Sequence, residues 1–444
     1  MINKFIKIVK SNKLISAVIF VGLCATLAYA FYFQVRVAVD AKAYNSIAWS
    51  LVQGTGYTET TNPIPDAAIG RLGPGYEFFL AFWYFLFGQK LWIIWILQSF
   101  LHVASGFILY LLIKEFYHGE KREEFASLAA GIYIFFIDLL EFPAMLMTET
   151  LYMFLVLLGI YYGLRMWRGP TLKNSSLATV FLTLAILVRP PALIVLVVLL
   201  LYLLVRKHFK LVLACVVISI LLLTPWTVRN YKVYNRLIVT SAILGYDIWV
   251  GNNPQSNHIG ELTATKEIDK FSEEKGLFEA NKRGKSEVLN LLFSHPKEFI
   301  KLQLTKTSIY FSAARPAAFW FHLTGTSQLL TIIFSSLFAY LLFIFGISGF
   351  VTQIKKRTLD SWFLVLVTLS APAGIIWIVA ETRYRYQIYP CLIILGVLFL
   401  AELYKNKKEL YRVLGIVAVL VTANTLFDFI HNSTRVIERL HNLW

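Results

Sequence analysis

Two carboxylates of the chain stand directly at the ends of apolar runs, where an ionisable side chain is costly. Asp40 follows the first long apolar run, and Glu149 begins a later one in "MTETLYMFLVLLGIYYGLR". Ionisable residues at a membrane edge indicate function by default. A carboxylate in such a place can act as a general base that removes a proton from a hydroxyl group. It can equally cap the N-terminus of a helix, so for both residues the sequence leaves catalysis and capping open.

Arginines gather beside aromatic residues at the ends of other apolar runs. The stretch "ETRYRYQIYP" places Arg383 and Arg385 two residues apart around Tyr384, and "TPWTVRNY" places Trp226 just before Arg229. Guanidinium groups bind phosphate through paired hydrogen bonds, and aromatic rings favour the headgroup level of a membrane. These stretches predict binding of a phosphate or pyrophosphate at the membrane surface. The alternative is an aromatic belt with arginines that only anchor the helices.

Several other chemistries lack their motifs in this sequence. There is no glycine-rich phosphate loop, no dinucleotide-binding glycine fingerprint and no helix with metal-binding histidines. The three cysteines, Cys24, Cys215 and Cys391, are far apart within apolar runs and are interpreted as packing residues. Pumping driven by nucleotide hydrolysis therefore has no support.

The elements that must position these side chains are membrane-spanning helices. The chain is 57% hydrophobic and only 15% charged, with mean hydropathy +0.63. Its apolar runs are continuous over about 20 residues, which predicts an all-α polytopic bundle and not a β-barrel. About eleven spans are expected, near 14–33, 91–113, 125–141, 148–166, 176–189, 190–205, 211–226, 327–350, 361–379, 386–403 and 411–429.

Lysine and arginine clusters predict the orientation of these spans. The formal charge of +16 arises from clusters that follow alternate spans, which indicates the positive-inside bias and no nucleic-acid partner. The N-terminus is then cytoplasmic, and 14–33 is a retained signal anchor of a multi-pass cell-membrane protein. The long loops 34–90 and 226–326 lie on the exoplasmic side of a single transmembrane domain, 1–444. The first loop should hold interfacial or re-entrant helices near 40–53 and 76–87, and the second an amphipathic helix near 278–293.

This orientation collects ionisable residues from the whole chain at one membrane face. The set comprises Asp40, Lys42, Arg71, Asp138, Glu141, Glu149, Arg189, Arg229, Arg383 and Arg385. Cations beside one or two acids at the exoplasmic surface suit a lipid phosphate, whose tail stays in the bilayer.

The ordered motifs resemble those of the GT-C glycosyltransferase superfamily, in the branch with protein O-mannosyltransferases and the lipid A aminoarabinose transferase. "VDAKAYNSIAWSLVQGTGY" is similar to the first-loop motif of that branch, and Asp40 takes the position of its catalytic carboxylate. In "RLGPGYEFFLAFWYFLFG", Arg71 falls where aminoarabinose transferases carry a lysine for the donor phosphate. Glu149 resembles the second acidic position.

The resemblance implies a GT-C-like bundle and an inverting sugar transfer from polyprenyl phosphate, such as undecaprenyl phosphate, to an envelope lipid, glycan or protein. A bacterial inner membrane is expected, with the site facing the periplasm. Asp40 would be the base, and Glu149 would orient the acceptor or position Lys42. The donor phosphate would bind Arg71, Arg383, Arg385, Arg229, Arg189 and Lys42, in a cavity with Tyr44, Tyr76, Tyr384 and Trp226.

No cofactor is expected, because Ala41 follows Asp40 where many relatives have a second acid, which argues against a bound metal. Two alternatives remain open. One is a lipid-linked oligosaccharide ligase or polymerase that uses a pyrophosphate-linked glycan. The other is a lipid or solute transporter, which would carry broken helices and charges at the bilayer midplane.

Overall fold

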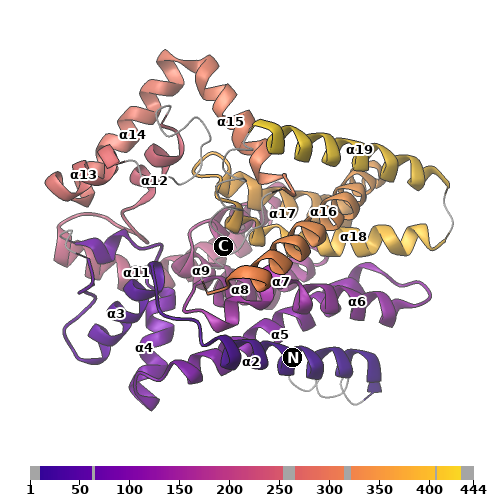
Figure 1. Ribbon diagram of the computed structural model, residues 1–444, viewed down its shortest axis with the longest axis horizontal. Helices are drawn as coiled ribbons and strands as arrows, with labels where there is room; N and C mark the ends of the chain where they lie inside the picture. Colours follow the sequence, from indigo (N-terminus) through magenta and orange to yellow (C-terminus); the bar gives the residue numbers. More distant parts are fainter. Residues whose placement is uncertain (1–10, 63–65, 254–265, 315–321, 406–407, 432–444) are drawn as a thin grey trace.

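The computed structural model describes residues 11–62, 66–253, 266–314, 322–405 and 408–431 (Figure 1). Within these ranges all regular structure is helical, which confirms the all-α prediction. Helices are found at all eleven predicted spans: α2 (Lys13–Phe33), α5 (Leu91–Phe116), α6 (Arg122–Phe135) with α7 (Ile137–Leu140), α8 (Glu149–Arg168), α9 (Leu172–Val188), α10 (Ala192–Val205), α11 (Phe209–Tyr234), α16 (Gly325–Lys356), α17 (Leu359–Ile375), α18 (Tyr389–Leu403) and α19 (Lys408–His431).

The number of membrane crossings is not fixed by these helices. In the described ranges, six are long and apolar enough to cross a membrane, or seven if α6 and its continuation, which meet at 62°, form one broken span. The predicted count of eleven is not confirmed, because α9, α10, α17 and α18 have only 14 to 17 residues. At 1.5 Å per residue such helices cover roughly 21–26 Å, less than the roughly 30 Å of a hydrocarbon core.

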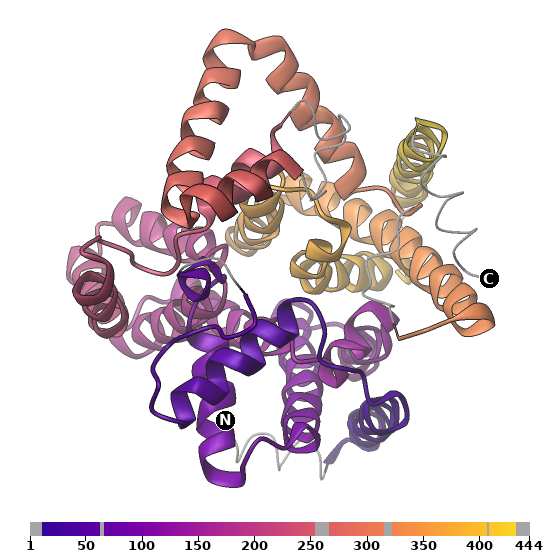
Figure 2. The same ribbon diagram turned by 60° about the vertical axis from the view of Figure 1, so that its left-hand side comes forward.

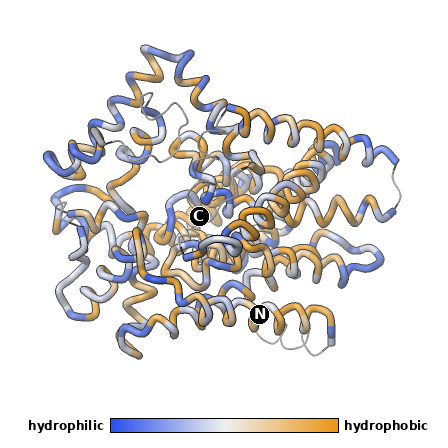
Figure 3. Tube along the Cα trace, viewed as in Figure 1, coloured by the Kyte–Doolittle hydropathy of each residue, from blue (hydrophilic) through white to orange (hydrophobic). Residues whose placement is uncertain are grey.

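The helices of the bundle are mainly hydrophobic, whereas several of the connecting loops are hydrophilic (Figure 3). The apolar windows of α5 and α8 are 72% and 78% buried, whereas those of α2, α11 and α19 are 22%, 11% and 17% buried. The three outer helices therefore present apolar side chains to their surroundings, as expected for lipid-facing helices of a multi-pass membrane protein. The most extensive helix pairs are α16 with α18, α8 with α9, and α5 with α6.

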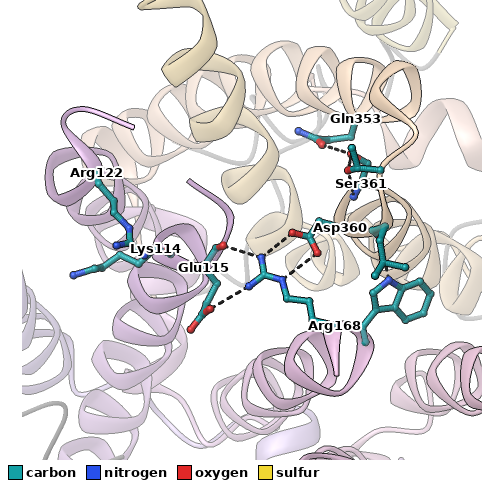
Figure 4. A network of polar contacts seen from close by, with 10 residues as sticks. Lys114, Glu115, Arg122, Arg168, Gln353, Asp360 and Ser361 are labelled. Carbon is teal, nitrogen blue, oxygen red and sulfur yellow. Dashed lines mark hydrogen bonds and ion pairs between the residues drawn. The ribbon is translucent and has the colours of Figure 1, made fainter. Parts of the chain in front are cut away.

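Polar contacts join the helices at the end of α8 that is remote from Glu149. Arg168, in the last turn of α8, binds Glu115 of α5 at 3.1 Å and Asp360 of α17 at 2.8 Å (Figure 4). A helix of 20 residues is about 30 Å long, so this network and Glu149 lie at opposite faces of the bundle. Arg168, which belongs to one of the basic clusters that predict the orientation, thus also links the ends of three helices.

The two long loops fold into helices at the other face. The first loop contains α3 (Asp40–Val52) and α4 (Gly75–Phe87), which pack on each other where interfacial helices were predicted. The second contains α12 (Leu244–Gly251), α13 (Lys266–Lys275), α14 (Leu277–Ser294) and α15 (Pro296–Tyr310). Helix α14 matches the predicted amphipathic segment, and Figure 2 shows α14 and α15 meeting at an apex above the bundle.

Two glycines allow α12 to lie directly against α14. A Cβ atom on Gly284 would come within 2.0 Å of the Gly245 carbonyl oxygen, and one on Gly245 within 1.9 Å of the Asn281 carbonyl oxygen. Both obstacles are backbone atoms, so a side chain fits only if one helix moves. The close approach fixes the position of α12, which contributes to the site described below.

Gly284→Ala should therefore destabilise the protein by roughly 1–3 kcal/mol through overpacking, although alanine favours a helix. The measurement is thermal unfolding of the purified protein in detergent. Gly415→Ala in α19 is the matched control, because a Cβ there meets no atom within 4 Å, and its stability should be unchanged or higher. Equal unfolding temperatures for the two variants would contradict the close-packing argument.

Candidate active site

A cavity of about 350 Å³ lies between the two long loops and the start of α18. Its wall is built from α3, the segment 70–72, α12, α13 and the 3₁₀ helix Thr382–Gln387. The first and the last of these elements are far apart in the chain, since Asp40 and Arg383 are separated by 343 residues. The charged side chains in the wall are Asp40, Arg71, Asp247, Asp269 and Arg383.

Asp40 is the first residue of α3, and its carboxylate faces two guanidinium groups. Oδ1 lies 3.6 Å from Arg71 Nη1, and Oδ2 lies 3.4 Å from Arg383 Nη2. The N-cap is Val39, and no side chain caps this helix, so the N-cap alternative for Asp40 is wrong. The Asp40 side chain is 28% exposed, which leaves it accessible from the cavity.

Arg71 is held by a second carboxylate that the sequence did not single out. Glu59 accepts hydrogen bonds from Arg71 Nε at 2.9 Å and from Nη2 at 2.5 Å, and its side chain is 2% exposed. The Ser46 hydroxyl accepts a 3.0 Å hydrogen bond from the Thr60 backbone, which docks this loop on α3. The two-point pair leaves Nη1 of Arg71 directed at Asp40. Nothing in the loop sequence around Glu59 indicated this role.

Glu149 and Arg189 form a buried ion pair next to the cavity. Glu149 Oε1 lies 3.3 Å from Arg189 Nη2, with side-chain exposures of 0% and 3%. The Thr148 hydroxyl donates to the other Glu149 oxygen at 3.1 Å, and Arg189 Nη1 donates to the Tyr386 hydroxyl at 2.5 Å. Thr148 is the N-cap of α8, so Glu149 lies in the first turn and its carboxylate is directed at Arg189. Glu149 does not line the Asp40 cavity.

A second, mainly apolar cavity of about 190 Å³ adjoins the first. Its wall includes Pro190, Pro191, Ile375 and Ile378, and its one arginine is Arg189. Both cavities are lined by Leu72, Ile243, Asp247 and Tyr384. The pair of cavities therefore fits an amphiphile whose chain lies in the apolar part and whose anionic group meets Arg189, Arg71 and Arg383.

Five of the predicted residues are placed elsewhere. Lys42 is exposed on α3 and lines neither cavity. Arg385 is fully buried and donates to the backbone carbonyls of Ser312 and Thr382, so it supports the 3₁₀ turn from behind. Tyr76 packs edge-to-face against Tyr44 and donates to Gln98 at 2.8 Å, outside both cavities.

The remaining two lie in an aromatic cluster between the long loops. The Arg229 guanidinium sits over the rings of Tyr57, Trp226 and Tyr234 at 5.5, 5.2 and 5.4 Å. Trp226 donates from its indole nitrogen to the Thr240 carbonyl at 2.7 Å. Arg229 and Trp226 thus pack the loops together, as in the anchoring alternative, and do not face the cavities.

Asp247 is a cavity residue that the sequence analysis missed. It lies in the eight-residue helix α12, too short for a periodic signal. Burial, and then the negative charge of Asp40, raise the pKa of Asp247 to about 7. A strongly raised pKa in a cleft marks a carboxyl group as a candidate for function.

The chain is similar to known proteins in sequence and in structure. The family model described as dolichyl-phosphate-mannose-protein mannosyltransferase matches residues 71–228, a little over a third of the chain. No curated protein matches the sequence. The chain is similar in structure to the oligosaccharyltransferase AglB from Archaeoglobus fulgidus, in complex with an inhibitory peptide and a dolichol-phosphate, with 14% identity, TM-score 0.52, and coverage of 93% of this chain and 54% of that one.

Two further solved structures are similar. The oligosaccharyltransferase of Archaeoglobus fulgidus in its apo form has 14% identity, TM-score 0.51, and coverage of 94% of this chain and 55% of that one. ArnT from Cupriavidus metallidurans, bound to undecaprenyl phosphate, has 13% identity, TM-score 0.40, and coverage of 86% and 76%. The chain spans about half the length of the oligosaccharyltransferases. Its fold is that of these oligosaccharyltransferases, which agrees with the GT-C-like bundle that the sequence motifs predict.

Proposed function

We propose that this protein is a membrane glycosyltransferase that moves a sugar from a polyprenyl-phosphate-linked donor to an acceptor hydroxyl at the exoplasmic face. The observation that carries the proposal is the Asp40 carboxylate between Arg71 and Arg383, in a polar cavity that adjoins an apolar one. The dolichyl-phosphate sugar in the description of the matching family and the dolichol-phosphate held by the similar AglB support a lipid-phosphate donor.

The reaction follows from the positions of these groups. Asp40 takes the proton of the acceptor hydroxyl, whose oxygen forms a bond to the anomeric carbon. The bond from that carbon to the phosphate oxygen breaks, and the electron pair leaves with the phosphate. Arg71, Arg383 and Arg189 stabilise the growing negative charge. A single displacement from the face opposite the phosphate inverts the anomeric carbon.

Donor binding also frees the base. At 3.4 and 3.6 Å the contacts of Asp40 with the two arginines are longer than good charged hydrogen bonds of about 2.7–2.9 Å. A phosphate offers both guanidinium groups closer oxygens, so they turn toward it and leave the Asp40 oxygens to the acceptor.

The residues around Asp40 do not fit a divalent metal. In the described ranges, no group of three or more His, Cys, Asp or Glu side chains is arranged to hold one. Asp40 faces two guanidinium groups, which repel a cation, and the neighbouring Ala41 offers no ligand. No step of the proposed reaction uses a metal.

The test is incubation of the purified protein in nanodiscs with two donor sets, undecaprenyl-phosphate sugars and undecaprenyl-pyrophosphate glycans, plus an envelope extract as acceptor. We expect mass spectrometry to detect release of undecaprenyl phosphate and a glycosylated acceptor. Release of undecaprenyl pyrophosphate would favour the ligase or polymerase. Movement of lipid across the bilayer without cleavage of either donor would favour the transporter. Comparing envelope glycolipids and glycoproteins with and without the protein would identify the acceptor.

Glu59→Gln should lower kcat by roughly 10- to 100-fold with little change in donor KM, since small misplacements at a reacting centre cost that much. Without Glu59, Arg71 has Asp40 as its nearest acid and binds it more tightly, which ties up the base. The measurement is steady-state transfer with one donor of varied concentration. Glu273→Gln, an exposed acid on α13, is the control. A rise in KM with unchanged kcat would contradict this role.

A further inference from the structure

Asp247 occupies the boundary between the two cavities. Of the four residues that line both, Leu72 and Ile243 are apolar, Tyr384 is aromatic and Asp247 is the acid. If the lipid chain fills the apolar cavity, its phosphate lies at this boundary beside the arginines, and the group attached to the phosphate extends into the polar cavity, which Asp247 also lines. The transferred sugar therefore comes within reach of Asp247.

The carboxylate of Asp247 lacks the partners that the other acids of the cavity have. Asp40 faces Arg71 and Arg383, and Asp269 accepts a hydrogen bond from the Tyr246 hydroxyl. Among the residues that the structure describes, Asp247 makes no side-chain hydrogen bond or ion pair. A partly buried carboxylate without partners is costly to keep, which favours a role that a ligand completes.

The helix that carries Asp247 is held firmly despite its length. Gly245 of α12 packs against α14, and its backbone N–H donates to the Asn281 side chain. At the other end of α12, a Cβ on Gly251 would come within 1.9 Å of the Ile378 carbonyl oxygen, next to the apolar cavity. Contacts at both ends thus fix the carboxylate at the boundary, as a binding residue requires.

We propose that Asp247 accepts hydrogen bonds from hydroxyl groups of the transferred sugar and thereby selects the donor, an inference that rests on the proposed function. A carboxylate has two oxygens and can accept from two neighbouring hydroxyls at once. A site built to bind a hydroxyl discriminates strongly against analogues that lack it, because its polar group is then left unpaired. The ligand class is a neutral, hydroxyl-bearing hexose or pentose on a phosphodiester.

The test compares binding of two charge-matched phosphodiesters to the purified protein in nanodiscs: undecaprenyl methyl phosphate and a panel of undecaprenyl-phosphate hexoses and pentoses. We expect the wild type to bind at least one sugar-bearing lipid at least tenfold more tightly than the methyl ester. Asp247→Asn should remove most of that difference and leave binding of the methyl ester equal or tighter, because a negative charge is lost near the phosphate. Glu273→Gln should retain the full difference.

A second arm uses donors that each lack one hydroxyl. The wild type should bind the donor that lacks the hydroxyl contacted by Asp247 more weakly than the complete donor. Asp247→Asn should bind these two donors equally well, because the effects of removing two groups in direct contact are not additive. A sugar-dependent difference that persists in Asp247→Asn would overturn the inference and leave the proposed function intact. Failure of the wild type to bind any of these lipids would instead count against the proposed function itself.

Discussion

Asp40→Asn should lower sugar transfer by roughly 10³-fold while the protein stays folded and still binds the donor. A general base contributes about 10²- to 10⁴-fold, and asparagine has nearly the shape of aspartate but cannot take the acceptor proton. The ion pairs with Arg71 and Arg383 are long, so their loss costs little stability. Donor affinity should be equal or higher, because both arginines are then free for the phosphate.

The measurement combines single-turnover transfer with binding of undecaprenyl methyl phosphate to the same preparation. Asp66→Asn is the matched control: Asp66 is exposed in the same loop, and its positive φ of 60° is one that asparagine also tolerates. If Asp40→Asn transfers sugar at a rate within a few-fold of wild type, the assignment of Asp40 as the general base is wrong. Loss of donor binding together with transfer would instead show that Asp40 shapes the phosphate site.

Breaking the Glu149–Arg189 pair should produce the largest loss of stability. Both side chains are almost completely buried, so either single change, Glu149→Gln or Arg189→Gln, leaves an uncompensated buried charge. Such changes cost roughly 3–5 kcal/mol. The double variant removes both charges and should recover most of that loss. Unfolding of the four proteins by SDS titration in mixed micelles gives the coupling between the two residues.

The same four proteins separate stability from donor binding. Arg189 lines the apolar cavity, whereas Glu149 reaches the site through Arg189. The double variant should therefore be folded but bind undecaprenyl methyl phosphate at least tenfold more weakly than wild type. Additive destabilisation in the double variant would show that the two charges do not compensate each other. If the folded double variant binds the lipid as tightly as wild type, Arg189 is not part of the phosphate site.

Part of the site could be predicted from the sequence, because the helix that carries Asp40 and Tyr44 was predicted. In an α-helix each residue turns by about 100°, so Lys42 points about 200° away from Asp40 while Tyr44 returns to its side. The structure places Tyr44 in the cavity and Lys42 outside it. Applied to the predicted helix near 40–53, this rotation separates Tyr44 from Lys42.

Arg383 and Arg385 show how a local backbone geometry that the sequence did not predict changes the composition of the site. Arg383 and Arg385 lie in a 3₁₀ helix, where each residue turns by about 120°, so two residues apart they point in different directions. Arg383 meets Asp40, and Arg385 turns to the backbone of Ser312. Two arginines two residues apart beside tyrosines predict one shared phosphate site. In the structure, only Arg383 of the two lines the cavity.

The sequence by itself determined the helical membrane class and the positions of the helices, and it singled out Asp40, Arg71 and Arg383 as candidate site residues. Patterns of hydropathy and charge are formed by residues that are neighbours in the sequence, so they can be recognised without knowledge of the fold. Only the tertiary structure decided that Glu59 holds Arg71 and that Asp247 lies between the two cavities. The Glu59–Arg71 pair joins residues 12 positions apart, and the cavities beside Asp247 join segments more than a hundred residues apart. Both sets of contacts are made by short loop elements whose sequences carry no periodic pattern.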